Sequence, residues 1–368
     1  MANSSLVEEC VVPKPLPFVV AGHLCLDLTP ALDVVRLPEP GSLVKAGPLH
    51  VSTGGAVANV GFALSRLGFE VRLAGLIGDD WTGELLSRLL LPLGEQSGVR
   101  IAPKRITSYS VVLTTQGRDR AFLHCSGPNE IFTSADVRDQ DLAGAGWLHF
   151  GYPPLMPAIA AQDGKELTNL LGRARSRGLR TSLDFCSMDS ATEFTNWPAV
   201  LRNCAELVTV FAPSIEELRI ALRFPTKEAG NLSDVRTLAH RLIDMGFAVV
   251  VIKLGIDGLY LRTTYSSDDL GRWRLGPEWC DLEFAVPCFR ADFINATGAG
   301  DCAIAGLIAS IASGDGPEEA ATIAAATGAS SVETPDASSG VPLMADLHER
   351  IHAGWERLGT RASIQLRP

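Results

Sequence analysis

The sequence contains few charged residues and no excess of basic ones. Only 20% of its 368 residues are charged, and 32 basic against 42 acidic residues give a net charge of −10. A chain without a basic field is not expected to bind nucleic acid or an anionic membrane surface. An anionic ligand would need a local positive site, such as the N-terminus of a helix.

Long apolar runs and closely spaced cysteines are also missing. No stretch of about 18 apolar residues is available to cross a membrane. The first residues lack the basic and apolar regions of a signal peptide. The eight cysteines form no CxxC pair, so neither a zinc site nor a disulfide framework is expected. We therefore expect a reduced, cytoplasmic protein.

The residues that are present alternate between strand-like and helical patterns. Hydrophobic residues make up 46% of the chain, which is enough for a large core. The apolar segment 18–21 predicts a buried strand, and further strands are expected at 148–150, 181–183, 207–211 and 248–252. Helical patterns separate the later strands. The expected fold is a three-layer α/β domain, in which helices flank a mostly parallel sheet.

Two segments outside this alternation predict a small β-sheet that acts as a lid. Residues 33–52 contain short β-like pieces, and 107–125 contains two strand-like runs around a hairpin turn at 116–120. An exposed edge strand of the lid could pair with a second subunit, which would give a homodimer. Residues 17–360 are expected to form the domain, between flexible tails at 1–16 and 361–368.

The clearest chemical pattern is the segment NATGAGD, which ends at Asp301 and leads into an apolar helix. Small residues before a helix leave backbone N–H groups open, and the helix dipole adds positive potential. Gly298, Ala299 and Gly300 would therefore form an anion hole suited to phosphate. Asp301 is placed to take a proton from an alcohol that attacks the phosphoryl group. Alternatively, Asp301 only caps the helix and the glycines only form a turn.

A second pattern lies near the N-terminus. Gly54 and Gly55 open a helix and let a ligand approach the backbone, while Asn59 offers a donor and an acceptor to a hydroxyl group. Asp27 follows the first strand, where open α/β sheets bind their ligands. Each feature also has an ordinary structural explanation as a turn or a first-turn polar residue. No GxxxxGK[ST] loop occurs, and Ala303 interrupts a GxGxxG pattern, which argues against a nicotinamide-dependent oxidoreductase.

Together, GGAVANVGFALSRLG…GLIGDDWTG and NATGAGDCAIAG resemble the two signatures of the ribokinase family, the PfkB-type carbohydrate kinases. The resemblance implies a ribokinase-like fold and transfer of the γ-phosphoryl group of ATP, with Mg²⁺, to an alcohol hydroxyl of a sugar or a similar acceptor. By this resemblance Asp301 would be the catalytic base beside the anion hole. The acceptor-binding residues would be Asp27, Gly54, Gly55 and Asn59.

The resemblance also implies residues for the nucleotide. Gly255 and Gly258 match a glycine loop that lies along ATP, and Lys253 before it could reach a phosphate as a point charge. The alternative for Lys253 is a solvated strand end. Asp184, which ends a strand, is a further candidate near the phosphates.

Two departures concern the metal ions. Glu217 matches the glutamate that orders Mg²⁺ through water, but Ser214 replaces the asparagine of that element. Glu217 could equally be an ordinary first-turn acid of a helix. Asn295 stands where the family usually has an aspartate that helps hold a monovalent cation, and this weakens the case for K⁺.

The acceptor remains open. Ala56 and Cys25 stand where ribokinase itself has a lysine and a sugar-binding asparagine, which counts against ribose. Arg120 and His124 of the lid could bind a phosphorylated acceptor. A nucleoside kinase of the same family is the main alternative, and its aromatic clamp would come from Tyr109, Phe122 or Phe132. A non-catalytic, ligand-sensing relative is the alternative from another class, favoured by Ser214 and Asn295.

Overall fold

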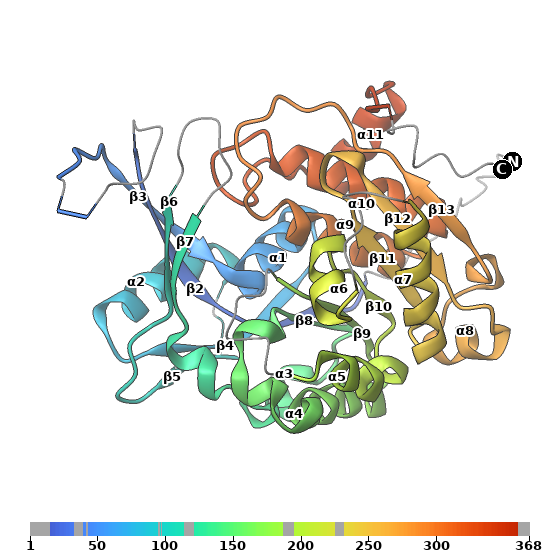
Figure 1. Ribbon diagram of the computed structural model, residues 1–368, viewed down its shortest axis with the longest axis horizontal. Helices are drawn as coiled ribbons and strands as arrows, with labels where there is room; N and C mark the ends of the chain where they lie inside the picture. Colours follow the sequence, from blue (N-terminus) through green and yellow to red (C-terminus); the bar gives the residue numbers. More distant parts are fainter. Residues whose placement is uncertain are drawn as a thin grey trace, which may run out of the picture.

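A nine-stranded sheet with the order β13-β12-β11-β10-β9-β8-β1-β4-β5 runs through the molecule (Figure 1). The computed structural model describes residues 15–32, 40–41, 43–94, 96, 98–113, 121–186, 195–224 and 232–359. The parallel strands are β1 (Phe18–Gly22), β4 (Val71–Gly78), β5 (Gly98–Ala102), β8 (Trp147–Gly151), β9 (Arg180–Asp184), β10 (Val210–Phe211) and β11 (Val249–Lys253). Two antiparallel strands, β12 (Leu259–Thr263) and β13 (Glu283–Val286), complete one edge.

Helices cover both faces of this sheet because its central strands are apolar on both sides. In β1, Phe18 and Val20 pack into one core, while Val19 and Ala21 pack into the other. The first core is shared with α1 (Gly55–Arg66), α2 (Trp81–Leu90), α8 (Ser267–Trp273), α9 (Ala299–Ser313), α10 (Pro317–Ser331) and α11 (Met344–His352). The second is shared with α3 (Asp139–Leu142), α4 (Pro157–Ser176), α5 (Trp197–Cys204), α6 (Ile215–Ala221) and α7 (Leu232–Met245). The predicted three-layer α/β fold is confirmed.

A second sheet of four strands lies to one side, with the order β3-β2-β6-β7 (Figure 1). Its strands are β2 (Cys25–Pro30), β3 (Leu49–Gly54), β6 (Tyr109–Leu113) and β7 (Ala121–Cys125). The expected lid segments supply β3, β6 and β7, but β2 was not expected. Asp27 does lie a few residues after the first strand, as expected, but the alternative of a turn residue is wrong because Asp27 lies within β2.

Some predicted features fall outside the described residues. These are most of the tail at 1–16, the tail at 361–368, residues 33–39 of the lid and its hairpin turn at 116–120, with Arg120. The seven described cysteines are all free thiols. Within the described ranges, no helix combines the length and apolar character that spanning a membrane requires.

Candidate active site

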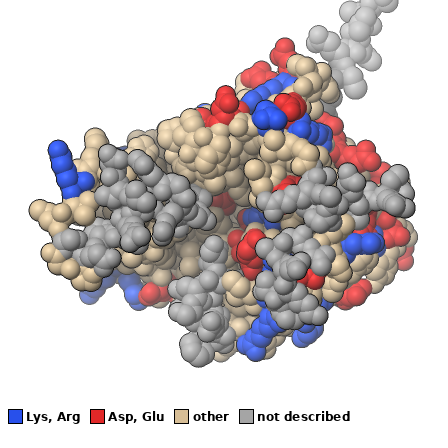
Figure 2. All heavy atoms as spheres, turned by 45° about the horizontal axis from the view of Figure 1, so that its top comes forward, with Lys and Arg blue, Asp and Glu red and all other residues tan. Residues whose placement is uncertain are grey.

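The carboxyl ends of neighbouring parallel strands bring the polar residues of the site together. His23 follows β1, Tyr152 follows β8, Asp184 ends β9 and Lys253 ends β11. Parallel strands present these ends at one edge of the sheet, where open α/β sheets bind ligands. Figure 2 shows a hollow near the middle of one face, with acidic and basic atoms inside it.

The N-terminus of α9 provides an opening for an anion. Gly298 precedes the helix with φ 74°, and a Cβ there would lie 2.5 Å from the Cβ of Ala337, so the position requires glycine. The Ala299 N–H donates to the Ala296 carbonyl at 3.3 Å. The amides of Gly300 and Asp301 have no acceptor within the described part of the chain. Of the predicted anion hole, the Gly300 N–H is therefore open, whereas the Ala299 N–H is already engaged.

Asp301 lies in the first turn of α9 and is 3% exposed. Its Oδ2 accepts hydrogen bonds from Asn59 Nδ2 at 2.8 Å and from the Tyr152 hydroxyl at 2.7 Å. Its Oδ1 is buried and has no hydrogen-bond partner among the residues described. Burial raises the pKa of Asp301, while Tyr152, Asn59 and Lys253 oppose that rise. The carboxyl group thus keeps one oxygen available to accept a proton.

The packing of α1 against α9 brings together the predicted residues Asn59 and Asp301, which are 242 positions apart. Tyr152 was missed by sequence reasoning. The feature that could have identified it is the segment Gly151-Tyr152-Pro153-Pro154. This segment directly follows a predicted strand, and the ends of such strands lie at the site.

Lys253 and Asp184 form a buried ion pair beside the opening of α9. Lys253 Nζ lies 2.7 Å from each carboxylate oxygen of Asp184. A Cβ on Gly300 would lie 3.2 Å from Lys253 Nζ, so the ammonium group is next to the open amides. Burial lowers the pKa of Lys253, but the Asp184 and Glu217 carboxylates outweigh it and the pKa is raised. The alternative of a solvated strand end is wrong, because this side chain is only 14% exposed.

The small sheet faces the site with a row of polar side chains. Asp27 of β2 is opposite Ser110 of β6, which is opposite His124 of β7. Directly opposed residues share one face of a sheet. Ser110 Oγ lies 3.0 Å from His124 Nδ1, and His124 Nε2 lies 3.2 Å from His23 Nε2. Burial, followed by the effect of His124, lowers the pKa of His23 to about 3, and the contact of His23 with His124 joins the small sheet to the large one.

The paired glycines at the start of α1 allow this close approach. A Cβ on Gly54 would lie 2.4 Å from a carboxylate oxygen of Asp27. Gly55 has φ 82°, and a Cβ there would lie 2.6 Å from His23 Nδ1. The two positions therefore hold Asp27 and His23 at the start of the helix that carries Asn59.

The two glycines after β11 differ from each other. Gly255 begins the short 3-10 helix Gly255–Asp257 with φ 60°, and a Cβ on it would meet nothing within 4 Å. Gly258 has φ 92°, and a Cβ on it would clash with the Val286 carbonyl of β13 at 2.0 Å. Gly255 thus leaves open surface for a ligand, whereas Gly258 is required by strand packing.

The two predicted cation-binding residues have structural partners. Glu217 Oε2 accepts from the Ser214 N–H at 2.7 Å, and the Glu217 N–H donates to Ser214 Oγ at 3.2 Å, which is a capping box at the start of α6. Asn295 Nδ2 donates to the Pro335 carbonyl at 2.6 Å, and its Oδ1 accepts from Thr297. Among the residues with described positions, no group of three or more His, Cys, Asp or Glu could hold a metal ion.

The aromatic residues considered for a nucleoside clamp lie in different environments. Phe132 is fully buried in the second core against Phe150, so it cannot cover a base. Tyr109 packs against the first core, and Phe122 is 52% exposed on β7. The clamp prediction is therefore wrong for Phe132.

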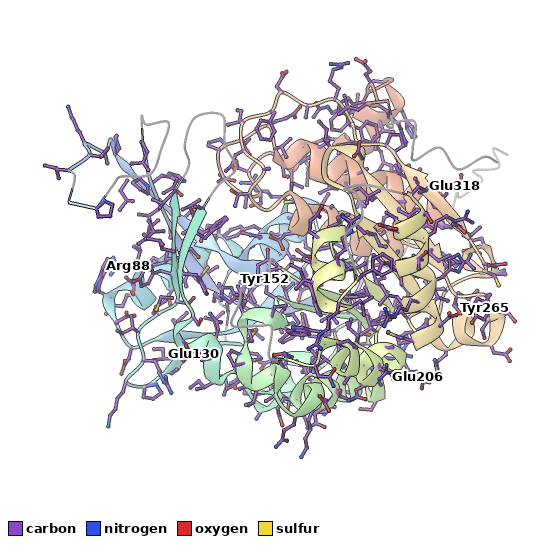
Figure 3. All side chains as sticks on the ribbon, in the orientation of Figure 1. Arg88, Glu130, Tyr152, Glu206, Tyr265 and Glu318 are labelled. Carbon is purple, nitrogen blue, oxygen red and sulfur yellow. The ribbon has the colours of Figure 1, made fainter. Side chains whose placement is uncertain are left out.

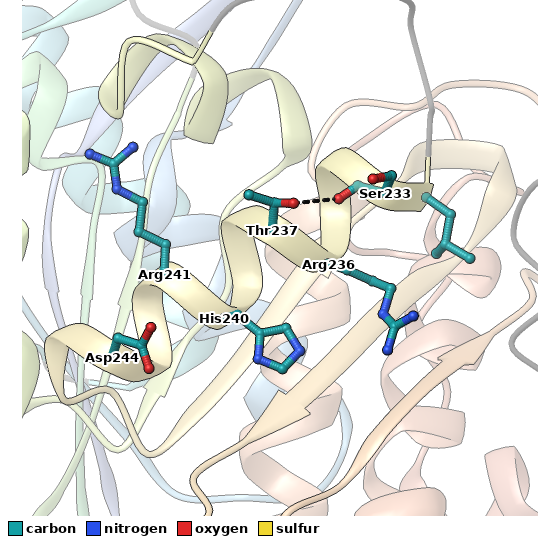
Figure 4. Close-up of a pocket in the computed structure, with 7 residues that line it drawn as sticks. Ser233, Arg236, Thr237, His240, Arg241 and Asp244 are labelled. Atoms are coloured by element: carbon teal, nitrogen blue, oxygen red, sulfur yellow. Dashed lines mark hydrogen bonds between the residues drawn. The ribbon is translucent and has the colours of Figure 1, made fainter.

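A depression of about 790 Å³ lies elsewhere, over α7 (Figure 4). It is lined by Leu232, Ser233, Arg236, Thr237, His240, Arg241 and Asp244. None of the predicted site residues borders it.

Comparison with known proteins agrees with this geometry. Residues 18–344 match the family described as pfkB family carbohydrate kinase. The chain is 25% identical over 309 residues to fructokinase-2 of Oryza sativa subsp. japonica, covering 82% of each chain. It is 26% identical over 314 residues to an ATP-dependent ribose-1-phosphate kinase of Halopiger xanaduensis, covering 84% of this chain and 89% of that protein.

The fold is also shared with a solved structure. Arabidopsis thaliana ribokinase, complexed with ribose and ATP, superposes with a TM-score of 0.70 at 20% identity, covering 92% of this chain and 98% of that one. The family match spans most of the chain and includes both glycine-rich segments of the site. The chain therefore belongs to the PfkB family of carbohydrate kinases.

Proposed function

We propose that the chain transfers the γ-phosphoryl group of ATP to a hydroxyl group of a sugar or a sugar-like acceptor, with Asp301 as the general base. The observation that carries this proposal is the buried Asp301 carboxyl group, whose Oδ1 has no partner among the described residues and which follows the open Gly300 amide. A proton acceptor and an anion site at one helix N-terminus are what an alcohol attacking a phosphoryl group requires.

One group of residues is proposed to bind the acceptor, and another is proposed to bind the phosphate. Asp27, Asn59 and the backbone at Gly54 and Gly55 hold the acceptor hydroxyls, and Asp301 Oδ1 takes the proton of the attacking one. The open amides of α9 receive the negative charge that the phosphoryl oxygens carry in a loose transition state. Lys253 lies beside those amides and offsets part of that charge, while Gly255 leaves room for the nucleotide.

The residues around the phosphate position suit Mg²⁺. The carboxylates of Asp184 and Glu217 both raise the pKa of Lys253, so both lie near its ammonium group. They would supply the oxygen donors that Mg²⁺ prefers, directly or through water. The ion would neutralise phosphate charge. Asn295 is neutral and its side chain already bonds to Thr297 and to the Pro335 carbonyl, which argues against a K⁺ site there.

The choice between a nucleoside and a sugar as the acceptor rests on two observations. The buried position of Phe132 removes one aromatic group from a nucleoside clamp. Two relatives named above are a fructokinase and a ribose-1-phosphate kinase, and the sequence identity of this chain to each of them is similar, at 25% and 26%. A sugar is therefore proposed over a nucleoside.

The small sheet is proposed to close over the acceptor, because Asp27 and His124 lie on its face toward the site. We also propose a homodimer formed through the edge of this sheet.

The test is ADP release from Mg-ATP with fructose, ribose, ribose 1-phosphate and adenosine, for the wild type and Asp301→Asn. We expect the variant to lose about 10²- to 10⁴-fold in turnover while ATP still binds. Asp346→Asn is the matched control, since Asp346 also lies in the first turn of a helix but is exposed on α11. Near-normal turnover in Asp301→Asn would contradict its role as base. ATP binding without turnover on any acceptor would instead support a ligand-sensing protein.

A further inference from the structure

Tyr152 has an unusual backbone conformation at the edge of the site. Its φ of 68° and ψ of 41° are left-handed, which is rare for a bulky residue and is not the extended conformation favoured before a proline such as Pro153. The conformation is held by two backbone hydrogen bonds. The Tyr152 N–H donates to the Asp184 carbonyl at 3.1 Å, and the Leu155 N–H donates to the Tyr152 carbonyl at 3.0 Å. Strained residues of this kind concentrate at functional sites.

The strained turn directs the phenol side chain toward α9. The Tyr152 hydroxyl donates to Asp301 Oδ2 at 2.7 Å, and its ring lies 6.0 Å from the ring of His23. Figure 3 shows Tyr152 near the middle of that view, and its side chain is half-buried. An extended backbone at this residue would send the side chain in another direction, so the contact with Asp301 depends on the left-handed turn.

We propose that Tyr152 is a positioning residue for the reaction, which fixes the Asp301 carboxyl group so that Oδ1 receives the proton of the acceptor. The inference rests on the proposed function of Asp301. Tyr152 and Asn59 both donate to Oδ2, at 2.7 Å and 2.8 Å, and no described residue donates to Oδ1. Two donors on one oxygen prevent the carboxyl group from rotating and leave the other oxygen as the proton acceptor.

Several other titratable groups also act on Asp301, and their effects must be separated from that of Tyr152. They are Lys253 of β11, Glu217 of α6, Asp184 of β9, and the thiols of Cys25, Cys186 and Cys302. Burial and the nearby Asp301 raise the pKa of Tyr152 well above its usual value, so the phenol stays protonated and remains a donor. Its hydrogen bond favours the charged form of Asp301.

The test compares wild type, Tyr152→Phe and Tyr260→Phe. Tyr152→Phe keeps the ring but removes the donor, so the pKa of Asp301 should rise and the acid limb of the kcat/KM profile should move to higher pH. We expect kcat near neutral pH to fall about tenfold, with the KM for ATP unchanged. Tyr260→Phe removes a hydroxyl from a buried tyrosine of β12 and should leave the profile in place.

The outcomes separate this inference from the proposed function. If Tyr152→Phe changes only the melting temperature and leaves both kcat and the acid limb unchanged, the positioning role is overturned. If the wild type phosphorylates no acceptor, the proposed function fails. In that case the Asp301 titration is followed by ¹³C-carboxyl NMR, with the signal identified by its loss in Asp301→Asn. An equal Asp301 pKa in wild type and Tyr152→Phe would then overturn the inference.

Discussion

At the residue scale, Lys253 and Asp184, which we propose to lie near the phosphate, already form an ion pair with each other. Lys253 contacts both oxygens of Asp184, and the carboxyl group of Asp184 is 1% exposed. Burial raises the pKa of Asp184 against the pull of Lys253. Removing one member of such a pair leaves the other buried without compensation, which is more costly than removing both.

This pairing predicts a non-additive effect on stability. Lys253→Met should lower the free energy of unfolding by about 3–5 kcal/mol, because the Asp184 carboxyl group stays buried and unpaired. The double variant Lys253→Met/Asp184→Asn should lose less than Lys253→Met alone, as measured by urea unfolding. Arg290→Ala, which breaks an ion pair that is exposed on both sides, is the control and should change stability little. Additive losses would contradict the coupling.

At the element scale, Glu217 at the start of α6 caps that helix, and we also propose that it binds Mg²⁺. Ser214 and Glu217 cap the helix reciprocally, which is the ordinary explanation that the sequence left open for Glu217. The same carboxylate helps raise the pKa of Lys253, so it also acts on a side chain that we propose to lie near the phosphate. Capping needs only an acceptor oxygen, whereas binding Mg²⁺ depends on the negative charge.

Two variants at this helix separate the roles. Ser214→Ala should lower the free energy of unfolding by about 1 kcal/mol and leave the Mg²⁺ dependence of activity unchanged. Glu217→Gln retains an oxygen for the cap, so stability should change less, but the Mg²⁺ concentration for half-maximal activity should rise. A Mg²⁺ dependence like that of the wild type in Glu217→Gln would show that this residue only caps the helix.

At the scale of the whole molecule, the small sheet has two edge strands that pair with no further strand in the part of the chain that the structure describes. Its outer strands are β3 and β7, where Leu49 is 56% and Leu123 is 61% exposed. Exposed apolar edge strands are prone to pair with another chain. This arrangement is the physical basis for the proposed homodimer.

The dimer is tested by sedimentation. We expect the wild type to sediment as a dimer and Leu123→Lys to shift toward the monomer, since a charge on the edge opposes pairing. Leu343→Lys, at a residue 55% exposed just before α11, is the control and should leave the assembly unchanged. A monomeric wild type at all concentrations would contradict the proposal.

Short-range patterns in the sequence predicted the layers of the fold and the chemical type of the site. Alternating apolar segments predicted the parallel sheet, and the glycine-rich segment before Asp301 predicted a helix N-terminus with open amides. The sheet and the start of α9 were predictable because hydrogen bonding and side-chain periodicity within an element depend on neighbouring residues. Of the amides expected to be open, that of Ala299 is engaged. The strand β2 was missed because its six residues lie close behind β1 and include Asp27, for which a turn was the structural alternative.

The sequence by itself determined the layered α/β fold and the kinase family, because both depend on patterns within short segments. Only the tertiary structure decided which side chains are paired: Asn59 with Asp301 across 242 positions, Lys253 with Asp184, and Tyr152, which the sequence did not reveal, with Asp301 Oδ2. The physical reason is that a side chain's partner, burial and proton affinity depend on which elements pack together, and that packing is set by contacts across the whole chain.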